Sequence, residues 1–269
     1  MKYIDFHTHI FPDKIAKQAV EALAAESGEY RPVIDGTLSA LMASMDKAGI
    51  SASLVANIAT KPAQMVPILD FCKQIKSDRI HPLISFHPFS DTEEVEDVFG
   101  QASREGIYGV KLHPMYQRFS IDGKHMYGFY ELMASFGFYV MFHTGFDVAF
   151  PGNDQADVEK VRKVANWFKD LTIVCTHVGG WRQWDRIHCL RECENVYTET
   201  SMTLSEMNDD EFVKHLSVFG EDRVLFGTDS PWTDQKKMLE RTLQLKISDS
   251  FKEKMLYKNA AKLLRIEKP

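Results

Sequence analysis

The sequence has little of what marks several classes of protein. Long basic runs are absent and the formal net charge is −6, which argues against a nucleic-acid or anionic-membrane partner. The longest strongly apolar stretch, residues 136–142, is too short to span a bilayer. The cysteines are too few and too scattered for a disulfide framework: Cys72, Cys175, Cys189 and Cys193. We therefore expect reduced cysteines and a small-molecule partner.

Signals of targeting and of multiple domains are also scarce. The first residues, MKYIDFH, lack the apolar core of a signal peptide, so we expect a cytoplasmic protein. No repeat, low-complexity tract or linker is evident, and 44% hydrophobic with 26% charged residues is typical of a globular chain. Because α/β barrels use about 250 residues as one unit, we predict a single domain over residues 1–269. The sequence does not decide whether the protein forms a homodimer.

Short apolar runs alternate with longer helical patterns along the chain. This alternation is typical of a parallel sheet built from βα units. An α/β fold of the (β/α)8 TIM-barrel type is favoured over an open sheet because the first and last strands then pair and leave no edge. We expect two helices between residues 13 and 49, further helices from residue 90 and over 154–169, and a last one over 248–264. The expected strands are 2–7, 53–58, 82–86, 107–112, 139–143, 172–177, 195–199 and 223–227.

The stretch IDFHTHIF places two histidines one residue apart at the end of the first strand. Side chains at positions i and i+2 of a strand leave the same face, so His7 and His9 can aim two imidazoles at one point. That is the geometry of a metal chelate. The alternative is that both histidines lie on a solvated face.

Polar residues also end four other expected strands. The fourth strand ends in Lys111 and His113, the fifth in His143, the sixth in His177 and the eighth in Asp229. In a barrel these carboxyl ends share one rim, where active sites gather. Taken singly, each histidine fits a hydrogen-bonded core position, and Asp229 fits a cap of the following helix or turn. Their shared position predicts a functional site.

Imidazoles together with one carboxylate suit Zn²⁺ that keeps a position open for water. Asp229 beside such a metal is predicted to accept the water's proton. Lys111 would either form an ion pair or, as a desolvated amine, accept CO₂ to give a carbamate that ligates a second metal. His113 is expected to ligate the metal or to donate a hydrogen bond to a substrate carbonyl.

Three further residues are candidates for substrate binding. Arg118 could hold a substrate carboxylate in a bidentate pair, unless it is a solvated surface arginine. Trp181 and Trp232 closely follow His177 and Asp229, and they are expected to wall a pocket for a planar substrate. The alternative for both tryptophans is packing of loops against the barrel.

Taken together, these motifs resemble the amidohydrolase superfamily of metal-dependent (β/α)8 barrels. The phrases DFHTHIFPDKIA, GVKLHPMYQ, FHTG, THVGGW, FGTDSPW and KNAAKLL resemble the amidohydrolase-related group that includes aminocarboxymuconate-semialdehyde decarboxylase. The resemblance covers residues 4–264. It implies a zinc bound by His7, His9, His143 and Asp229, with His177 contacting the water or completing the shell.

Lys111 departs from the decarboxylase-like pattern. A Gly-x-Lys at the end of strand four is similar to the carbamylated lysine of binuclear members such as urease, in which a histidine two residues later contacts substrate. The resemblance therefore leaves the metal count open, with one zinc preferred, two zincs the alternative, and another divalent metal not excluded.

The leading function predicted from the sequence is hydrolysis of an amide, ester or lactone of a small carboxylated molecule. Asp229 would transfer the proton, and His177 or Lys111 would stabilise the oxyanion. The alternative is zinc-dependent, non-oxidative decarboxylation of an unsaturated or aromatic carboxylate. A barrel that serves only as a binding module is disfavoured because none of the expected ligands is missing.

Overall fold

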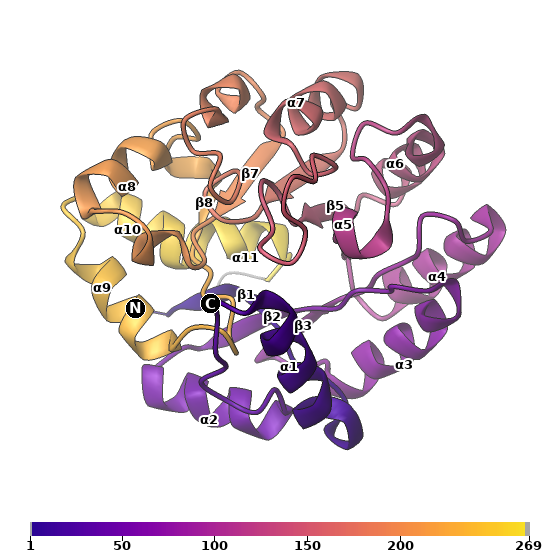
Figure 1. Ribbon diagram of the computed structural model, residues 1–269, viewed down its shortest axis with the longest axis horizontal. Helices are drawn as coiled ribbons and strands as arrows, with labels where there is room; N and C mark the ends of the chain where they lie inside the picture. Colours follow the sequence, from indigo (N-terminus) through magenta and orange to yellow (C-terminus); the bar gives the residue numbers. More distant parts are fainter. Residues whose placement is uncertain (1, 267–269) are drawn as a thin grey trace. The chain divides into compact units, whose positions relative to one another are not determined.

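The computed structural model describes residues 2–266, in which strands and helices alternate along the chain (Figure 1). The strands are β1 (Ile4–Thr8), β2 (Ala52–Ala56), β3 (Ile80–Leu83), β4 (Gly109–Leu112), β5 (Tyr139–Phe142), β6 (Thr172–Cys175), β7 (Val196–Glu199) and β8 (Val224–Leu225). The helices are α1 (Asp13–Ser27), α2 (Leu38–Ala48), α3 (Met65–Ile75), α4 (Thr92–Arg104), α5 (Pro114–Gln117), α6 (Tyr127–Ser135), α7 (Val158–Trp167), α8 (Asp209–Leu216), α9 (Gln235–Gln244), α10 (Asp249–Glu253) and α11 (Asn259–Leu263).

All eight expected strands are present, most of them shorter than the apolar runs that predicted them. The runs continue past the strand ends because the loops that follow are also buried, as at residues 226–231 after β8. Two helices lie between residues 13 and 49 as expected. Gly28 and Gly49 end α1 and α2 in the left-handed conformation that glycine adopts most readily.

Side-chain caps set where several helices begin. Asp91 accepts hydrogen bonds from the backbone N–H groups of Glu93 and Glu94 and so starts α4. Asp157 caps α7 in the same way, which places its start four residues later than the expected residue 154. The expected last helix is divided, because a π-helical turn over Lys254–Lys258 joins α10 to α11.

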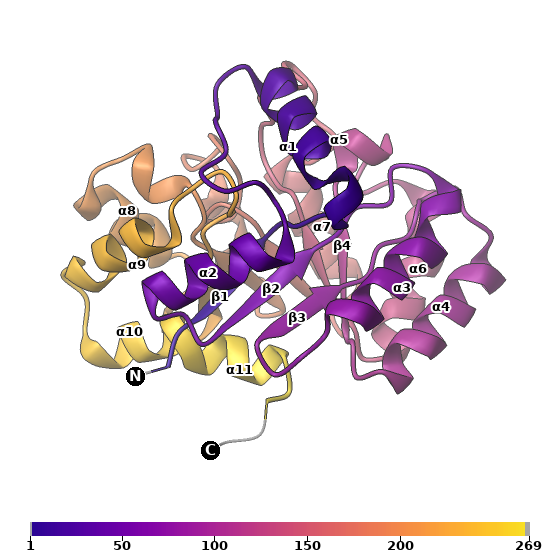
Figure 2. The same cartoon turned by 90° about the horizontal axis from the view of Figure 1, so that it is seen from below.

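The chain forms two compact units. The first comprises residues 2–56, 77–81 and 199–266. Here β1 lies parallel to β2, with Ile4 opposite Ala52, and the two strands lie side by side in Figure 2. The N–H of Phe6 donates to the carbonyl of Phe226, just after β8, at 2.7 Å. The first and last strands are therefore neighbours, as a barrel requires.

The second unit comprises residues 57–76 and 82–198. Strands β4, β5, β6 and β7 are hydrogen-bonded in that order as a parallel sheet. Ile84, which follows β3, donates its N–H to the carbonyl of Gly109 in β4 at 3.1 Å, so β3 borders β4. The core of this unit is rich in aromatic rings, including the contacting pair Phe86 and Phe99.

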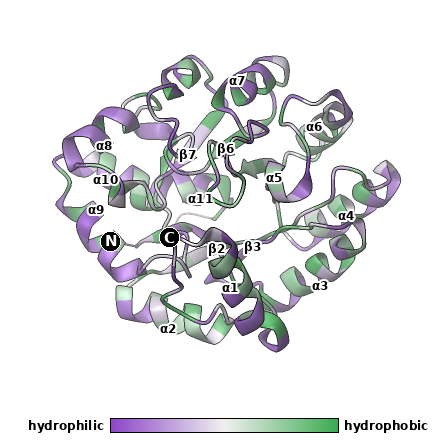
Figure 3. Cartoon of the chain, in the orientation of Figure 1, coloured by the Kyte–Doolittle hydropathy of each residue, from purple (hydrophilic) through white to green (hydrophobic). Residues whose placement is uncertain are grey.

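Helix faces follow the usual division between buried and exposed residues. Figure 3 shows both hydrophobic and hydrophilic segments within α3 and α4. In α4 the buried residues Val95, Val98, Phe99 and Ala102 recur at helical spacing, whereas Glu93, Glu94 and Glu96 are exposed. Within residues 2–266, no helix is both long enough and apolar enough to cross a membrane.

Candidate metal centre

His7 and His9 direct their rings toward one another in the first unit. His7 lies in β1 with only 1% of its surface exposed, and His9 follows the strand and is partly exposed. Their Nε2 atoms are 3.1 Å apart. Nδ1 of His9 lies 2.8 Å from the carbonyl of Ala56. A carbonyl only accepts hydrogen bonds, so Nδ1 of His9 carries the proton and Nε2 is left with a lone pair.

Asp229 approaches the same two imidazoles from the loop after β8. Its Oδ1 lies 3.2 Å from Nε2 of His9 and 3.5 Å from Nε2 of His7. Its backbone is left-handed (φ 63°), and its N–H donates to the carbonyl of His7 at 2.7 Å. The capping alternative for Asp229 is wrong with respect to the next helix, because Asp234 caps α9.

These three side chains form a donor set that suits a divalent cation. Two imidazole nitrogens and one carboxylate oxygen lie 3.1 to 3.5 Å from one another. Ligands bound to a single ion at roughly 2.0–2.2 Å in tetrahedral geometry have about this spacing. The residues of the first unit therefore fit a metal through His7, His9 and Asp229.

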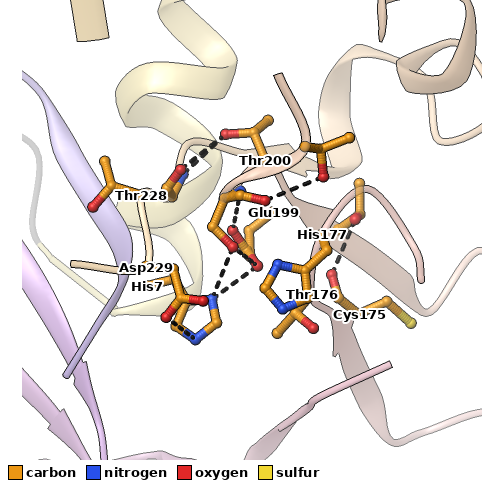
Figure 4. A network of polar contacts seen from close by, with 12 residues as sticks. His7, Cys175, Thr176, His177, Glu199, Thr200, Thr228 and Asp229 are labelled. Carbon is orange, nitrogen blue, oxygen red and sulfur yellow. Dashed lines mark hydrogen bonds and ion pairs between the residues drawn. The ribbon is translucent and has the colours of Figure 1, made fainter. Parts of the chain in front are cut away.

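Sequence reasoning missed a buried carboxylate beside His7. Glu199, the last residue of β7, is fully buried, and its Oε1 lies 2.9 Å from Nδ1 of His7 (Figure 4). Ser201 hydrogen-bonds to the same carboxylate. The sequence did contain a signal for Glu199, because it is the last residue of the expected strand 195–199 and active-site residues gather at the carboxyl ends of barrel strands.

A second missed carboxylate, Asp5, supports the backbone of the site. Asp5 is fully buried in β1, and its Oδ1 accepts from the N–H groups of His7 at 3.2 Å and Thr228 at 2.9 Å. Its Oδ2 accepts from Gln235 at 2.7 Å. Burial raises the pKa of Asp5 to about 7, although the hydrogen bonds from Gln235, Thr228 and His7 oppose this shift.

The second unit holds another imidazole cluster, at the ends of β4 and β5. His113 is buried, and its ring stacks on His143 with centroids 4.3 Å apart and planes 13° apart. Asp147, also missed from the sequence, places Oδ2 3.2 Å from Nε2 of His113 and 3.7 Å from Nε2 of His143. Tyr116 packs edge-on against His113.

The stacking makes this second cluster a poor chelate. A metal ion lies in the plane of each imidazole that binds it, close to the nitrogen lone pair. The planes of His113 and His143 are nearly parallel, so they do not meet at a common point within bonding distance. Of the two clusters, the geometry therefore favours His7, His9 and Asp229 as the chelate.

Burial and neighbouring charges shift the pKa values of His143 and Asp147 in the second cluster. Burial holds the pKa of His143 well below its ordinary value. The nearby His113, His177 and Lys111 act in the same direction, and the charge of Asp147 opposes them. Burial alone would raise the pKa of Asp147. The hydrogen bond from His113 and the charges of the two histidines outweigh burial, so the pKa of Asp147 is lowered. Lys111 itself lies in β4 and is buried.

His177 begins a tight turn after β6. His177, Val178 and Gly179 all have positive φ angles. The ring of His177 meets His143 edge-on at 5.1 Å, and on another side it meets Trp181 at 5.3 Å. Trp181 is buried.

The remaining predicted substrate residues lie in different settings. Arg118 follows α5 with a left-handed backbone and an exposed side chain. Trp232 is half-buried in the first unit, and its backbone N–H donates to the backbone carbonyl of Asp229 at 2.9 Å. Among the predicted residues, the structure thus brings together His7, His9 and Asp229 in one unit, and His113, His143 and His177 in the other.

A family model and several solved structures match nearly the whole chain. The family model described as amidohydrolase matches residues 4–266. No curated protein matches the chain. Among solved structures, a TIM-barrel protein of Bordetella bronchiseptica is 23% identical, with 98% of this chain and 99% of that chain covered and a TM-score of 0.81.

Two 5-carboxyvanillate decarboxylases share the fold at lower identity. The Sphingomonas paucimobilis enzyme is 15% identical, with 99% of each chain covered and a TM-score of 0.73. The Novosphingobium aromaticivorans enzyme, solved with manganese bound, is 14% identical, with 98% and 97% covered and a TM-score of 0.75. These likenesses confirm the expected (β/α)8 barrel fold. The match of the family model over residues 4–266 shows that the chain belongs to the amidohydrolase family.

Proposed function

We propose that this protein is a zinc-dependent hydrolase that attacks the carbonyl of an amide, ester or lactone in a small, carboxylated molecule. The observation that carries the proposal is the convergence of His7, His9 and Asp229 within 3.5 Å. Two imidazoles and a carboxylate suit zinc, although manganese suits such a site too. A bound divalent cation supplies positive charge that acidifies water and polarises a carbonyl.

Asp229 is the proton carrier in this reaction. As the water oxygen forms a bond to the carbonyl carbon, the carboxylate of Asp229 accepts the water's proton. The bond between that carbon and the leaving group then breaks, and Asp229 returns the proton to the leaving group. Its side chain is about 10% exposed, so it can reach substrate while bulk water is largely kept away.

The proposal retains the other roles expected from the sequence. His177 and Lys111 are proposed to stabilise the oxyanion, and His143 to complete the metal shell. His113, Arg118, Trp181 and Trp232 are proposed to bind substrate. A second metal on a carbamylated Lys111 is the alternative for the cofactor.

Non-oxidative decarboxylation is the second candidate and is at least as well supported. Solved enzymes with this fold include 5-carboxyvanillate and 2,6-dihydroxybenzoate decarboxylases. In this reaction the bond between a carbon and its carboxylate breaks, CO₂ leaves, and the electron pair stays on the carbon. A protonated Asp229 then delivers its proton to that carbon.

One assay separates the two reactions. The metal-loaded protein is incubated with a library of amides, esters and lactones and with a matched library of aromatic and unsaturated carboxylates. Acid or alcohol release from the first library, without CO₂ from the second, supports hydrolysis. CO₂ release from the second library, without acid or alcohol release from the first, supports decarboxylation and rejects hydrolysis. Loss of either activity on treatment with a chelator is expected in both cases.

A further inference from the structure

We propose that Glu199 is a positioning residue that sets which nitrogen of His7 faces the metal. It does so by accepting the proton of Nδ1, which leaves the lone pair of His7 on Nε2. The metal affinity of the site then depends on a carboxylate that does not itself bind the metal. This inference rests on the metal-dependent function proposed above.

The hydrogen-bond chemistry defines the tautomer. Oε1 of Glu199 lies 2.9 Å from Nδ1 of His7, and both side chains are buried. An ionised carboxylate only accepts hydrogen bonds, so Nδ1 of His7 is the donor. A neutral imidazole has a single N–H, and Nε2 therefore carries the lone pair. That atom lies 3.1 Å from Nε2 of His9 and 3.5 Å from Oδ1 of Asp229. Figure 4 shows His7 between Glu199 and Asp229.

Ser201 holds the carboxylate of Glu199 in place. The backbone N–H of Ser201 donates to Oε2 at 2.6 Å, and its hydroxyl donates to Oε1 at 2.8 Å. The ring N–H of His7 also donates to Oε1, so each oxygen of the Glu199 carboxylate has at least one donor. This arrangement satisfies a buried charge and restricts its rotation.

Gly227 supplies the space that the carboxylate occupies. A Cβ at this position would lie 2.2 Å from Oε2 of Glu199 and 3.1 Å from Cβ of His7. The backbone of Gly227 has no unusual demand on φ, so the requirement for glycine here is one of space. Any larger residue must displace the carboxylate or the histidine.

An amide in place of the carboxylate is expected to reverse the tautomer. In Glu199→Gln, the amide oxygen must accept from the backbone N–H of Ser201, because that donor is buried and fixed. The amide NH₂ then faces Nδ1 of His7, and the hydroxyl of Ser201, 3.1 Å from Nδ1, is free to donate to it as well, so Nδ1 becomes the acceptor. The proton of His7 moves to Nε2, and the lone pair needed by the metal is lost.

The experiment measures metal affinity and the tautomer of His7 separately. Zn²⁺ affinity comes from competition with a chromophoric chelator, and the tautomer comes from long-range ¹H–¹⁵N NMR spectra of the metal-free protein. We expect Glu199→Gln to show Nε2 protonation and to bind Zn²⁺ about 10- to 100-fold more weakly. Gly227→Ala, which keeps Glu199, should weaken binding similarly.

The matched control is Thr200→Val. Thr200 is buried in the same loop, and its hydroxyl hydrogen-bonds to Gly227 but not to His7. A merely structural role for the loop predicts that this variant loses as much affinity as Glu199→Gln. We expect its affinity and its His7 tautomer to match those of the wild type.

The outcomes separate this inference from the proposed function. If the wild type binds Zn²⁺ and Glu199→Gln binds it equally well, the positioning role is overturned. A wild-type spectrum with the proton on Nε2 of His7 overturns it as well. A wild type that binds no divalent cation overturns the proposed function, and the NMR spectra still decide the role of Glu199. If Glu199→Gln does not fold, Ser201→Ala gives the weaker form of the same test, with a smaller loss of affinity.

Discussion

Asp5 and Thr228 are joined by two hydrogen bonds across 223 residues of sequence. The N–H of Thr228 donates to Oδ1 of Asp5 at 2.9 Å, and its hydroxyl donates to Oδ2 at 2.6 Å. Asp5 precedes His7 by two residues, and Thr228 directly precedes Asp229. The pair therefore ties together the two backbone segments that carry the proposed ligands.

The raised pKa of Asp5 predicts a pH-dependent stability. Its folded pKa of about 7 lies above the ordinary 3.8, so the folded protein keeps a proton that the unfolded chain has released. The stabilisation is fully present below the ordinary pKa and is lost as the pH rises toward 7. We expect the destabilisation caused by Asp5→Asn, measured by urea unfolding, to shrink over this range.

The control for this measurement is Asp97→Asn. Asp97 is exposed on α4. The free energy of unfolding of Asp97→Asn should change with pH in the same way as that of the wild type. If the wild type and Asp5→Asn change in parallel with pH, the assigned protonation of Asp5 is wrong.

Removing the proton carrier should abolish turnover but retain metal. We expect Asp229→Asn to lower kcat by at least about 100-fold, because general acid–base catalysis typically contributes this much or more. The asparagine oxygen can still approach the metal, so much of the metal should remain bound. Metal content and kcat are measured on the same preparation, and undiminished turnover would refute the role of Asp229.

His9→Ala tests the chelate directly. Because His9 is one of three convergent donors, its loss should weaken Zn²⁺ binding by more than the 10- to 100-fold that is typical of residues outside the ligand set. The rise in melting temperature that Zn²⁺ produces in the wild type should disappear. His188→Ala, which removes an exposed imidazole, is the control, and equal behaviour of the two variants would count against the site.

Gln117 is predicted to be important for stability. This fully buried side chain donates to the carbonyls of Ala59 at 2.9 Å and Phe86 at 2.7 Å, and it accepts from the N–H of His113 at 2.8 Å. Leaving buried polar groups unsatisfied costs about 1–3 kcal/mol each.

We expect Gln117→Ala to reduce the free energy of unfolding by at least about 3 kcal/mol, measured with urea. The exposed Gln18 on α1 provides the control, and Gln18→Ala should change it by less than about 0.5 kcal/mol. A Gln117→Ala variant as stable as the wild type would show that the three backbone groups find other partners.

The strands and most helices could be predicted from the sequence because their signals are local. Apolar runs marked all eight strands, and glycines marked the ends of α1 and α2. The start of α7 was misplaced because Asp154 and Asp157 are both acceptable caps, and only the folded chain shows that Asp157 is used.

The candidate site was only partly predictable. His7 and His9 share a local motif, and Asp229 was identified by its place at a strand end. Glu199 was missed because its partner, His7, lies 192 residues away, and no local pattern links a strand-ending glutamate to a particular histidine. Asp147 lies only four residues after His143, but its contact with His113 depends on how two loops pack.

The sequence by itself determined the kinds of donor atom available and the strand ends that carry them, because side-chain chemistry and periodicity are local properties. Only the tertiary structure decided which donors meet and which ring nitrogens face them. Hydrogen bonds such as those from His7 to Glu199 and from His9 to Ala56 form between segments distant in sequence, and these contacts set the direction of each lone pair.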